Sequence, residues 1–292
     1  MIIDGKSLAQ AILRQLAQDI KQGVARGKHP PKLVVFTVAP TSESIAYINS
    51  KRSRMEEIGG VCEVMHYTKA PRFEHLVGKL SKIAQMPETS GVIVQLPLPA
   101  GLGTISLMDY IPDQKEVEGF KKKSQYASPL GLAVLTMLRS VYTPIDLDKP
   151  ETVIVDIHKD VDYFRTTMRR KKIVVLGHGL TGGQPLGEVL SRLKISYINI
   201  NENTPTPEEY INQADIIISC VGKTVVHAEH IKQGSILVSV GLHRENGKWV
   251  GDYDESQVAS KALAYSPTPG GVGPLNVAYL LSNTVMAWEM QE

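Results

Sequence analysis

Three polar residues in the first hundred positions have types and spacings suited to proton transfer. Tyr47 and Lys51 are four residues apart in a segment whose pattern predicts a helix, so both side chains project from one face. Gln95 lies in an otherwise apolar predicted strand, at its carboxyl end. A buried amide must find hydrogen-bond partners, and open α/β sheets bind ligands at the carboxyl ends of their strands. Each residue taken alone is also explained as an ordinary surface or structural group.

The loop Ser266-Pro-Thr-Pro-Gly-Gly-Val-Gly-Pro274 is a second candidate. Prolines fix φ, whereas glycines let the backbone approach a ligand closely. The alternation predicts a stiff loop shaped by its backbone, which would serve either as a tight interdomain connector or as part of a site. Pro274 suits the first turn of a final helix that we expect to reach about Glu289.

A third candidate is the turn Gly177-His178-Gly179-Leu180-Thr181-Gly182, between a predicted strand at 171–176 and a predicted helix at 185–193. In this context a Gly-x-Gly-x-x-Gly turn predicts binding of a dinucleotide pyrophosphate. Glu202 follows the end of the next predicted strand, where an acid bonds the ribose hydroxyls of NAD and repels the 2′-phosphate of NADP. The sequence therefore favours NAD over NADP.

Alternating helical and strand patterns must position these candidates. The strands are continuous apolar runs, which predicts an α/β fold with parallel sheets covered on both faces. The predicted strands lie at 33–38, 61–67, 91–96, 171–176, 195–200, 215–221 and 235–240. Residues 141–170 read as a connector or insertion to which the sequence assigns no role.

Composition narrows the class of protein. A chain of 292 residues suits two domains, and 42% hydrophobic with 21% charged residues is typical of soluble proteins. A net charge of +2 gives no case for nucleic acid or membrane binding, and no apolar run approaches the roughly 20 residues of a membrane span. Two cysteines in apolar runs, Cys62 and Cys220, predict buried free thiols, and the histidines show no metal-site spacing. With no secretory pattern at the start, we expect a cytoplasmic protein.

Taken together, these segments resemble the bifunctional methylenetetrahydrofolate dehydrogenase/methenyltetrahydrofolate cyclohydrolase family over nearly the whole chain. The resemblance is carried by Ile3-Asp-Gly-Lys6, Tyr47-x-x-x-Lys51, Val94-Gln-Leu-Pro-Leu-Pro99, Val221-Gly-Lys223, Gly251-Asp-x-Asp254 and Pro267-x-Pro-Gly-Gly-Val-Gly-Pro274. The Gln-Leu-Pro-Leu-Pro and Pro-Gly-Gly-Val-Gly-Pro segments are highly specific in combination.

The resemblance implies a site and a set of roles. Lys51 would transfer the proton in hydrolysis, Gln95 would orient Lys51 or the water, and Tyr47 would pack against the folate rings. Substrate-binding residues would further include Glu118, Pro269, Gly270 and Gly271. The candidate residues for the cofactor, NAD or NADP, are those of the glycine turn and the following strand, Gly177, His178, Gly179, Gly182 and Glu202, together with Gly273 of the loop.

The resemblance also implies an architecture. A folate-binding catalytic domain, 1–140, would be completed by the final helix, 274–292. A Rossmann-type dinucleotide-binding domain, 141–273, would follow it in the chain, with 141–170 as the connector or insertion and an active-site cleft between the domains. The expected partners are a small-molecule folate and a second copy in a homodimer, with no nucleic acid, membrane or metal.

Four departures from the family pattern stand out. Glu118 and Glu116 replace the two acids of Lys-Asp-Val-Asp-Gly-Phe, lysines at 121–123 replace a polar loop, His178 replaces an arginine, and Ser239 replaces an aspartate. These departures leave two alternatives open: an enzyme with only one of the two activities, or a folate- or nucleotide-binding paralogue without turnover.

Overall fold

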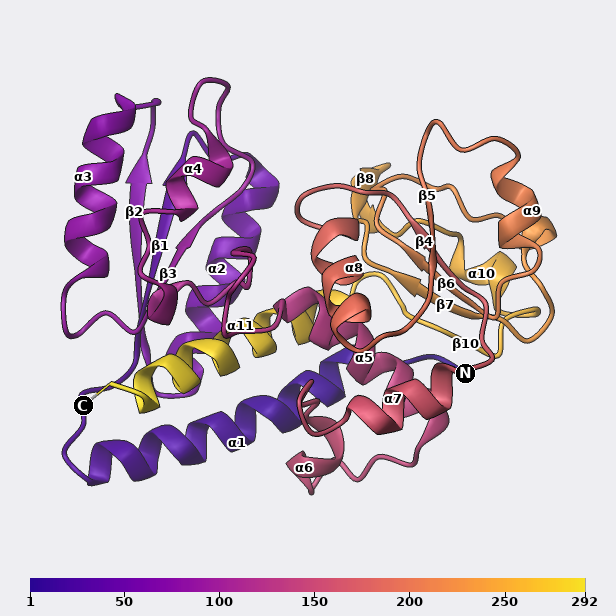
Figure 1. The fold of residues 1–292 in the computed structure, drawn as a ribbon, viewed down its shortest axis with the longest axis horizontal. Coiled ribbons are helices and arrows are strands. Elements are labelled where there is room, and N and C mark those ends of the chain that lie inside the picture. Colours follow the sequence, from indigo (N-terminus) through magenta and orange to yellow (C-terminus); the bar gives the residue numbers. More distant parts are fainter. Residues whose placement is uncertain (292) are drawn as a thin grey trace. The chain divides into compact units, whose positions relative to one another are not determined.

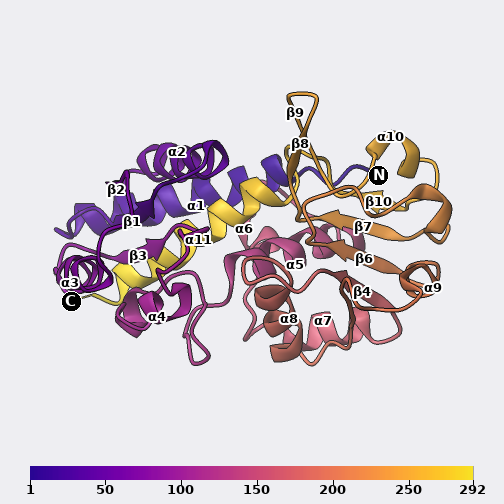
Figure 2. The same ribbon diagram turned by 90° about the horizontal axis from the view of Figure 1, so that it is seen from above.

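The computed structural model describes residues 1–291, apart from the side chains of residues 104 and 105. The chain divides into two compact units, each built around a parallel sheet (Figures 1 and 2). The three-stranded unit comprises residues 12–129 and 277–292, and the five-stranded unit comprises 1–11 and 130–276. Residue 292, the end of the predicted final segment, lies outside the described residues. Across the described chain, no helix combines the length and apolar character needed to cross a membrane.

The three-stranded unit has the sheet order β2-β1-β3, with all strands parallel. Its elements are α1 (Gly5–Ala25), β1 (Lys32–Val38), α2 (Ser42–Glu57), β2 (Val61–Tyr67), α3 (Phe73–Ala84), β3 (Gly91–Val94), α4 (Thr104–Met108), the 3₁₀ turn η1 (Asp113–Lys115) and α11 (Val272–Glu289). Helices α1 and α11 continue into the five-stranded unit. Figures 1 and 2 show α2 and α3 on opposite faces of this sheet.

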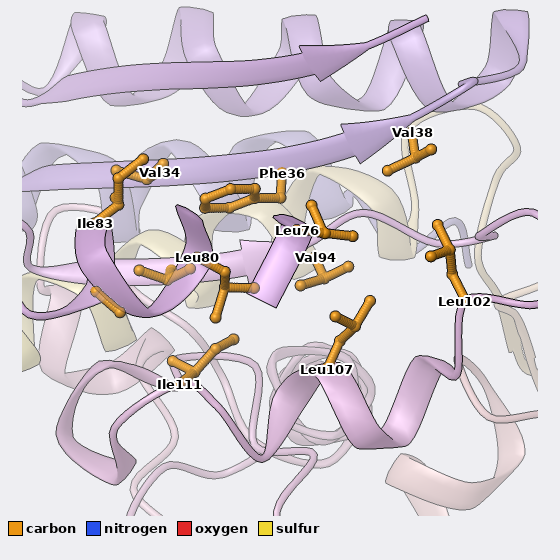
Figure 3. Close-up of a cluster of buried hydrophobic side chains, with 12 residues drawn as sticks. Val34, Phe36, Val38, Leu76, Leu80, Ile83, Val94, Leu102, Leu107 and Ile111 are labelled. Atoms are coloured by element: carbon orange, nitrogen blue, oxygen red, sulfur yellow. The ribbon is translucent and has the colours of Figure 1, made fainter. Parts of the chain in front are cut away.

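The core on the α3 face explains why β1 reads as a continuous apolar run. Val34, Phe36 and Val38 point to this face with period two, and Leu76 and Leu80 of α3 pack against them (Figure 3). The intervening residues of β1 are also buried, because helices cover both faces of the strand. Strand β1 is therefore held firmly at the centre of the sheet. Its pairing with β2 and β3 fixes where the carboxyl ends of these two strands lie.

The five-stranded unit has the order β10-β7-β6-β4-β5, again parallel. Its elements are α5 (Pro129–Tyr142), α6 (Pro150–Val153), α7 (Val161–Met168), β4 (Ile173–Leu176), α8 (Gly183–Arg192), β5 (Ile198–Ile200), α9 (Pro207–Ile211), β6 (Ile216–Ser219), η2 (Ala228–His230), β7 (Ile236–Ser239), β8 (His243–Glu245), β9 (Lys248–Val250), α10 (Glu255–Val258) and β10 (Ala264–Tyr265). The strands are shorter than predicted. The edge strand β5, for example, pairs with β4 at three positions only.

Residues 141–170 form two short helices, α6 and α7, within the five-stranded unit. Arg139 organises them: its guanidinium donates to the carbonyl of Ile154 at 2.9 Å and forms an ion pair with Asp160 at 2.5 Å. The same guanidinium lies 5.1 Å from the Tyr163 ring centroid. The segment is thus an ordered helical part of this unit.

Candidate active site

Lys51 and Gln95 form the centre of the candidate site in the three-stranded unit. Thr41 caps helix α2, its hydroxyl accepting from the Ser44 N–H at 3.2 Å. Lys51 follows on this helix with only 7% of its surface exposed, and its Nζ donates to Gln95 Oε1 at 2.9 Å. The amide of Gln95 is oriented from its other end, because Nε2 donates to the Leu96 carbonyl at 2.9 Å.

Gln95 lies just beyond β3, which ends at Val94, and not inside the strand as predicted. Its backbone N–H still donates to the Phe36 carbonyl at 2.8 Å and so continues the pairing with β1. The cis Leu96–Pro97 peptide follows. Gln95 therefore combines a strand-like backbone position with a half-buried side chain that reaches α2.

Burial and neighbouring charges alter the protonation of this pair. Burial lowers the pKa of Lys51, and the charge interaction with Glu118 opposes that shift. Burial raises the pKa of Glu118 to about 7, with Lys51 acting in the opposite direction and Glu116 adding to the rise. The site thus holds an amine that gives up its proton more readily than usual, close to a carboxyl that titrates near neutrality.

Tyr47 lies one turn before Lys51 on α2 and is half-buried. Burial raises the pKa of its phenol above the usual value of 10, so the hydroxyl stays protonated at neutral pH. The structure therefore groups Lys51, Gln95 and Glu118 through a hydrogen bond and electrostatic interaction, with Tyr47 adjacent on the same helix.

The other predicted site residues belong to the five-stranded unit, where the glycine turn follows β4. Gly177 adopts a φ of +93°, and Asn199 Nδ2 donates to its carbonyl at 2.9 Å. A Cβ at Gly183 would lie 2.1 Å from the Gly177 oxygen, whereas a Cβ at Gly179 would meet nothing within 4 Å. Gly183 is the close-packing position that the sequence analysis missed, although the Gly182-Gly183 pair could have indicated it. The backbone at Gly179 is open to a ligand.

His178 and Glu202 are both exposed near this turn. Glu202 follows β5 in a turn closed by the Asn201 side chain, whose Oδ1 accepts from the Asn203 N–H at 2.9 Å. The helix after the glycine turn, α8, begins at Gly183, two residues earlier than predicted, so its first N–H groups adjoin the turn. The N–H groups of Gly182 and Gln184 both donate to the Gly179 carbonyl, at 3.2 and 3.1 Å, and Pro185 has no N–H, so the start of α8 is tied back to the turn.

Asp252 is a structural residue of the five-stranded unit to which the sequence analysis assigned no role. It is fully buried, and its carboxylate accepts from the N–H groups of Val221 and Gly222 at 2.9 and 3.0 Å and from the Ser219 hydroxyl at 2.5 Å. Its own N–H donates to Ser239 Oγ at 2.8 Å. Ser239, which stands at the family's aspartate position, is therefore part of the network that fixes the turn after β6.

The proline- and glycine-rich loop is held from two sides within the five-stranded unit. A Cβ at Gly5 would lie 1.9 Å from the Gly271 oxygen, so the start of α1 packs directly on the loop backbone. The Thr268 N–H donates to Glu255 Oε1 at 2.6 Å, and the Thr268–Pro269 peptide is cis. Helix α11 begins at Val272, two residues before the predicted start. The loop has the fixed backbone that its composition predicts.

Comparison with known proteins identifies the family. Residues 3–118 match the catalytic-domain model of tetrahydrofolate dehydrogenase/cyclohydrolase, and residues 150–292 match its NAD(P)-binding domain. The bifunctional protein FolD of Staphylococcus aureus strain N315 is 31% identical over 294 residues, covering 99% of this chain and 97% of the relative. The chain belongs to the tetrahydrofolate dehydrogenase/cyclohydrolase family.

Further members of the tetrahydrofolate dehydrogenase/cyclohydrolase family agree in sequence and fold. The FolD protein of Lactobacillus gasseri is 33% identical over 292 residues, covering 99% of this chain and 98% of its own length. The crystal structure of the Campylobacter jejuni bifunctional enzyme FolD superposes with a TM-score of 0.85 at 26% identity, covering 99% and 98% of the two chains. The family resemblance and the two-domain α/β fold class are confirmed; the roles of individual site residues stay predictions.

Cys62 and Cys220 are free thiols, as predicted, but both are half-buried and not fully buried. Burial raises the pKa of the Cys62 thiol to about 11 and that of Cys220 to about 12. Among residues 1–291, no three or more His, Cys, Asp and Glu side chains are grouped so that they could hold a metal ion.

Proposed function

We propose that this chain oxidises 5,10-methylenetetrahydrofolate to the methenyl form with NAD(P) and hydrolyses the product to 10-formyltetrahydrofolate. The observation that carries the proposal is the buried Lys51, whose Nζ lies 2.9 Å from the oriented amide of Gln95. A lysine with a lowered pKa suits general base catalysis near neutral pH. Membership of the tetrahydrofolate dehydrogenase/cyclohydrolase family supports both activities.

Hydrolysis follows from the chemistry of the oxidised substrate. Loss of a hydride from the one-carbon bridge leaves a delocalised cation between two nitrogens. Water adds to the cationic carbon, and Lys51, in its deprotonated form, accepts the proton that the water loses. Gln95 Oε1 holds Lys51 Nζ in place, so the amine keeps one orientation while the ring opens to the formyl product.

In this proposal, Glu118 and Tyr47 position the substrate. An ionised Glu118 matches the paired N–H donors of the amino-pyrimidinone edge of the pterin in a bidentate arrangement. Its pKa of about 7 means that donors bound there would favour the ionised form. The half-buried ring of Tyr47 offers an apolar surface to the folate rings. Pro269, Gly270 and Gly271 are further candidates for substrate binding through their backbone.

The residues of the glycine turn fit a dinucleotide. Open space over Gly179 would admit a pyrophosphate to the backbone of the turn, with the Gly183 N–H at the start of α8 as a donor toward it. A bound nicotinamide supplies the hydride acceptor. Gly177, Gly179 and Gly182 would shape the turn, with His178 and Gly273 as further contacts.

We further propose a preference for NAD, assigned to Glu202. This exposed acid follows β5, and its charge would repel the 2′-phosphate of NADP. The test is the ratio of kcat/KM for NAD over NADP in the parent and in Glu202→Ser, with Glu209→Ser on α9 as an exposed control. A parent that prefers NADP, or an unchanged ratio in Glu202→Ser, would remove this role.

Two assays separate the proposed function from its alternatives. The purified protein is given methylenetetrahydrofolate with each nucleotide and, separately, methenyltetrahydrofolate alone. Nucleotide reduction and methenyl hydrolysis together support the bifunctional enzyme, and either one alone defines a single-activity enzyme. Folate binding without either reaction would replace the proposal with a binding paralogue.

A cytoplasmic homodimer is the remaining part of the proposal. It rests on the family resemblance and on two free thiols, which are typical of a reducing compartment. Light scattering from the purified chain gives its mass in solution directly. A monomer mass at the assay concentration would contradict the dimer.

A further inference from the structure

Glu116 is a buried acid that the proposed chemistry does not use. Only 2% of its surface is exposed, and its side chain has no Lys or Arg partner among the contacts of the described chain. The nearby Lys121 ammonium binds Asp113 at 2.7 Å and the Ile111 carbonyl at 2.5 Å. Burial raises the pKa of Glu116, and hydrogen bonds from three backbone N–H groups and the Ser124 side chain lower it. Burying a carboxylate costs free energy, and these hydrogen bonds offset part of that cost.

The hydrogen bonds of Glu116 all converge on the turn that carries Glu118. Oε1 accepts from the N–H of Glu118 at 3.0 Å and of Phe120 at 3.3 Å, and Oε2 from the N–H of Lys121 at 3.5 Å. The backbone of Glu116 is itself anchored, since it forms a parallel bridge with Val92 of β3. The acid thus links the turn to the strand that precedes Gln95.

The same turn is fixed from its other side. Asn283 of α11 is 3% exposed and donates through Nδ2 to the carbonyls of Val117 at 2.8 Å and Ala127 at 3.0 Å. Gly119 adopts a φ of +73°, and a Cβ there would lie 2.9 Å from the Ser128 nitrogen. Glu118 therefore projects from a backbone with little freedom.

We propose that Glu116 is a positioning residue, which fixes the backbone of Glu118 so that the Glu118 carboxyl meets the pterin edge next to Lys51. This inference rests on the proposed function for the role of Glu118. Glu116 touches no substrate; it acts through the turn. A purely structural cap would affect stability and both kinetic constants together, whereas a positioning residue acts on the properties of Glu118.

The kinetic test is a double-mutant cycle with Glu116→Gln and Glu118→Gln. We expect Glu116→Gln to raise the KM for methylenetetrahydrofolate about tenfold, with kcat within about threefold and the nucleotide KM unchanged. In the double variant we expect no further rise in the KM above that of Glu118→Gln, because the effect of Glu116 passes through Glu118. Additive effects, or a loss confined to kcat, would overturn the proposal.

A readout without substrate separates this inference from the proposed function. The side-chain carboxyl of Glu118 is titrated by carbon NMR in the parent, Glu116→Gln and Glu116→Asp. Glu116 and burial raise the pKa of Glu118 and Lys51 lowers it, so Glu116→Gln should shift the titration to lower pH. Glu116→Asp keeps the charge and should leave the titration nearer the parent while still raising the folate KM. Glu116→Asp also tests the proposal if Glu116→Gln does not fold.

The possible results are distinct. If the parent neither binds nor converts folate but the Glu118 titration shifts as expected, the proposed function fails and the control of Glu118 by Glu116 stands. If the parent is active and the titration is the same in all three proteins, the positioning role is refuted. Glu74→Gln, at an exposed acid of α3, is the matched control and should alter neither readout.

Discussion

Lys51→Met separates the two proposed reactions. Methionine keeps most of the length of the buried stem and removes the ammonium that donates to Gln95 Oε1 at 2.9 Å. The unpaired amide oxygen costs about 1–3 kcal/mol, and relief of the buried charge offsets part of this loss. We therefore expect a folded protein with an altered site.

The magnitude follows from the role of the lysine in each step. Hydrolysis needs a base to accept the proton of water, so its kcat should fall about 10²–10⁴-fold, and a 10²-fold loss corresponds to about 2.7 kcal/mol of activation free energy. Hydride loss from the bridge moves no proton through Lys51, so nucleotide reduction should continue. Because Lys51 lowers the pKa of Glu118, its removal should raise that pKa above about 7 and increase the folate KM at neutral pH.

The assay follows reduced nucleotide and methenyltetrahydrofolate together. Parent protein should form reduced nucleotide with little methenyl build-up, whereas Lys51→Met should accumulate the methenyl form. Lys82→Met, at an exposed lysine of α3, is the control and should behave as the parent. Undiminished hydrolysis in folded Lys51→Met would refute the assigned role of Lys51.

Three further predictions concern the remaining groups. Folding raises the pKa of Glu118 from 4.5 to about 7, so its contribution to the free energy of unfolding is complete below pH 4.5 and is lost as pH rises through 7. The free energy of unfolding, measured by urea titration, should therefore fall between pH 4.5 and 7.5, and Glu118→Gln should abolish up to about 3 kcal/mol of that fall. An identical fall in both proteins would contradict the shift. Gly183→Ala should destabilise the protein by about 1–3 kcal/mol because its Cβ would meet the Gly177 oxygen. Gly179→Ala should keep the parent Tm while raising the nucleotide KM, and equal Tm values for the two alanine variants would show that the turn relaxes freely. Asp252→Asn should raise the nucleotide KM and leave methenyl hydrolysis intact, since Asp252 accepts from the N–H groups after β6; parallel loss of both activities would point to general unfolding.

The local sequence pattern was sufficient to predict much of the fold. Strand β1 follows its apolar run to within one residue of the predicted range, and the apolar residues of α3 repeat with helical spacing. The strands of the five-stranded unit are shorter than predicted at one end or both, because the ends of a strand depend on pairing with a neighbour. Hydrophobicity alone does not encode that pairing. Residues 141–170 could not be interpreted, since α6 and α7 depend on the tertiary contacts of Arg139.

The candidate site was only partly predictable for the same reason. Four-residue spacing placed Tyr47 and Lys51 on one helix, but the hydrogen bond between Lys51 and Gln95 joins residues 44 positions apart. A close backbone approach requires glycine at position 183, and backbone N–H groups donate to the side chains of Asp252 and Glu116. The residue types alone do not show these roles. Each role becomes recognisable from a close approach or a buried hydrogen-bond network, and these are visible only in the folded structure.

The most direct test of the central claim is one progress curve. Parent protein, methylenetetrahydrofolate and the preferred nucleotide are mixed, and reduced nucleotide, methenyltetrahydrofolate and 10-formyltetrahydrofolate are quantified over time. The account predicts equal amounts of reduced nucleotide and formyl product with little free methenyl intermediate. Nucleotide reduction matched by methenyl accumulation, or no reduction with either nucleotide, would contradict two activities in this chain.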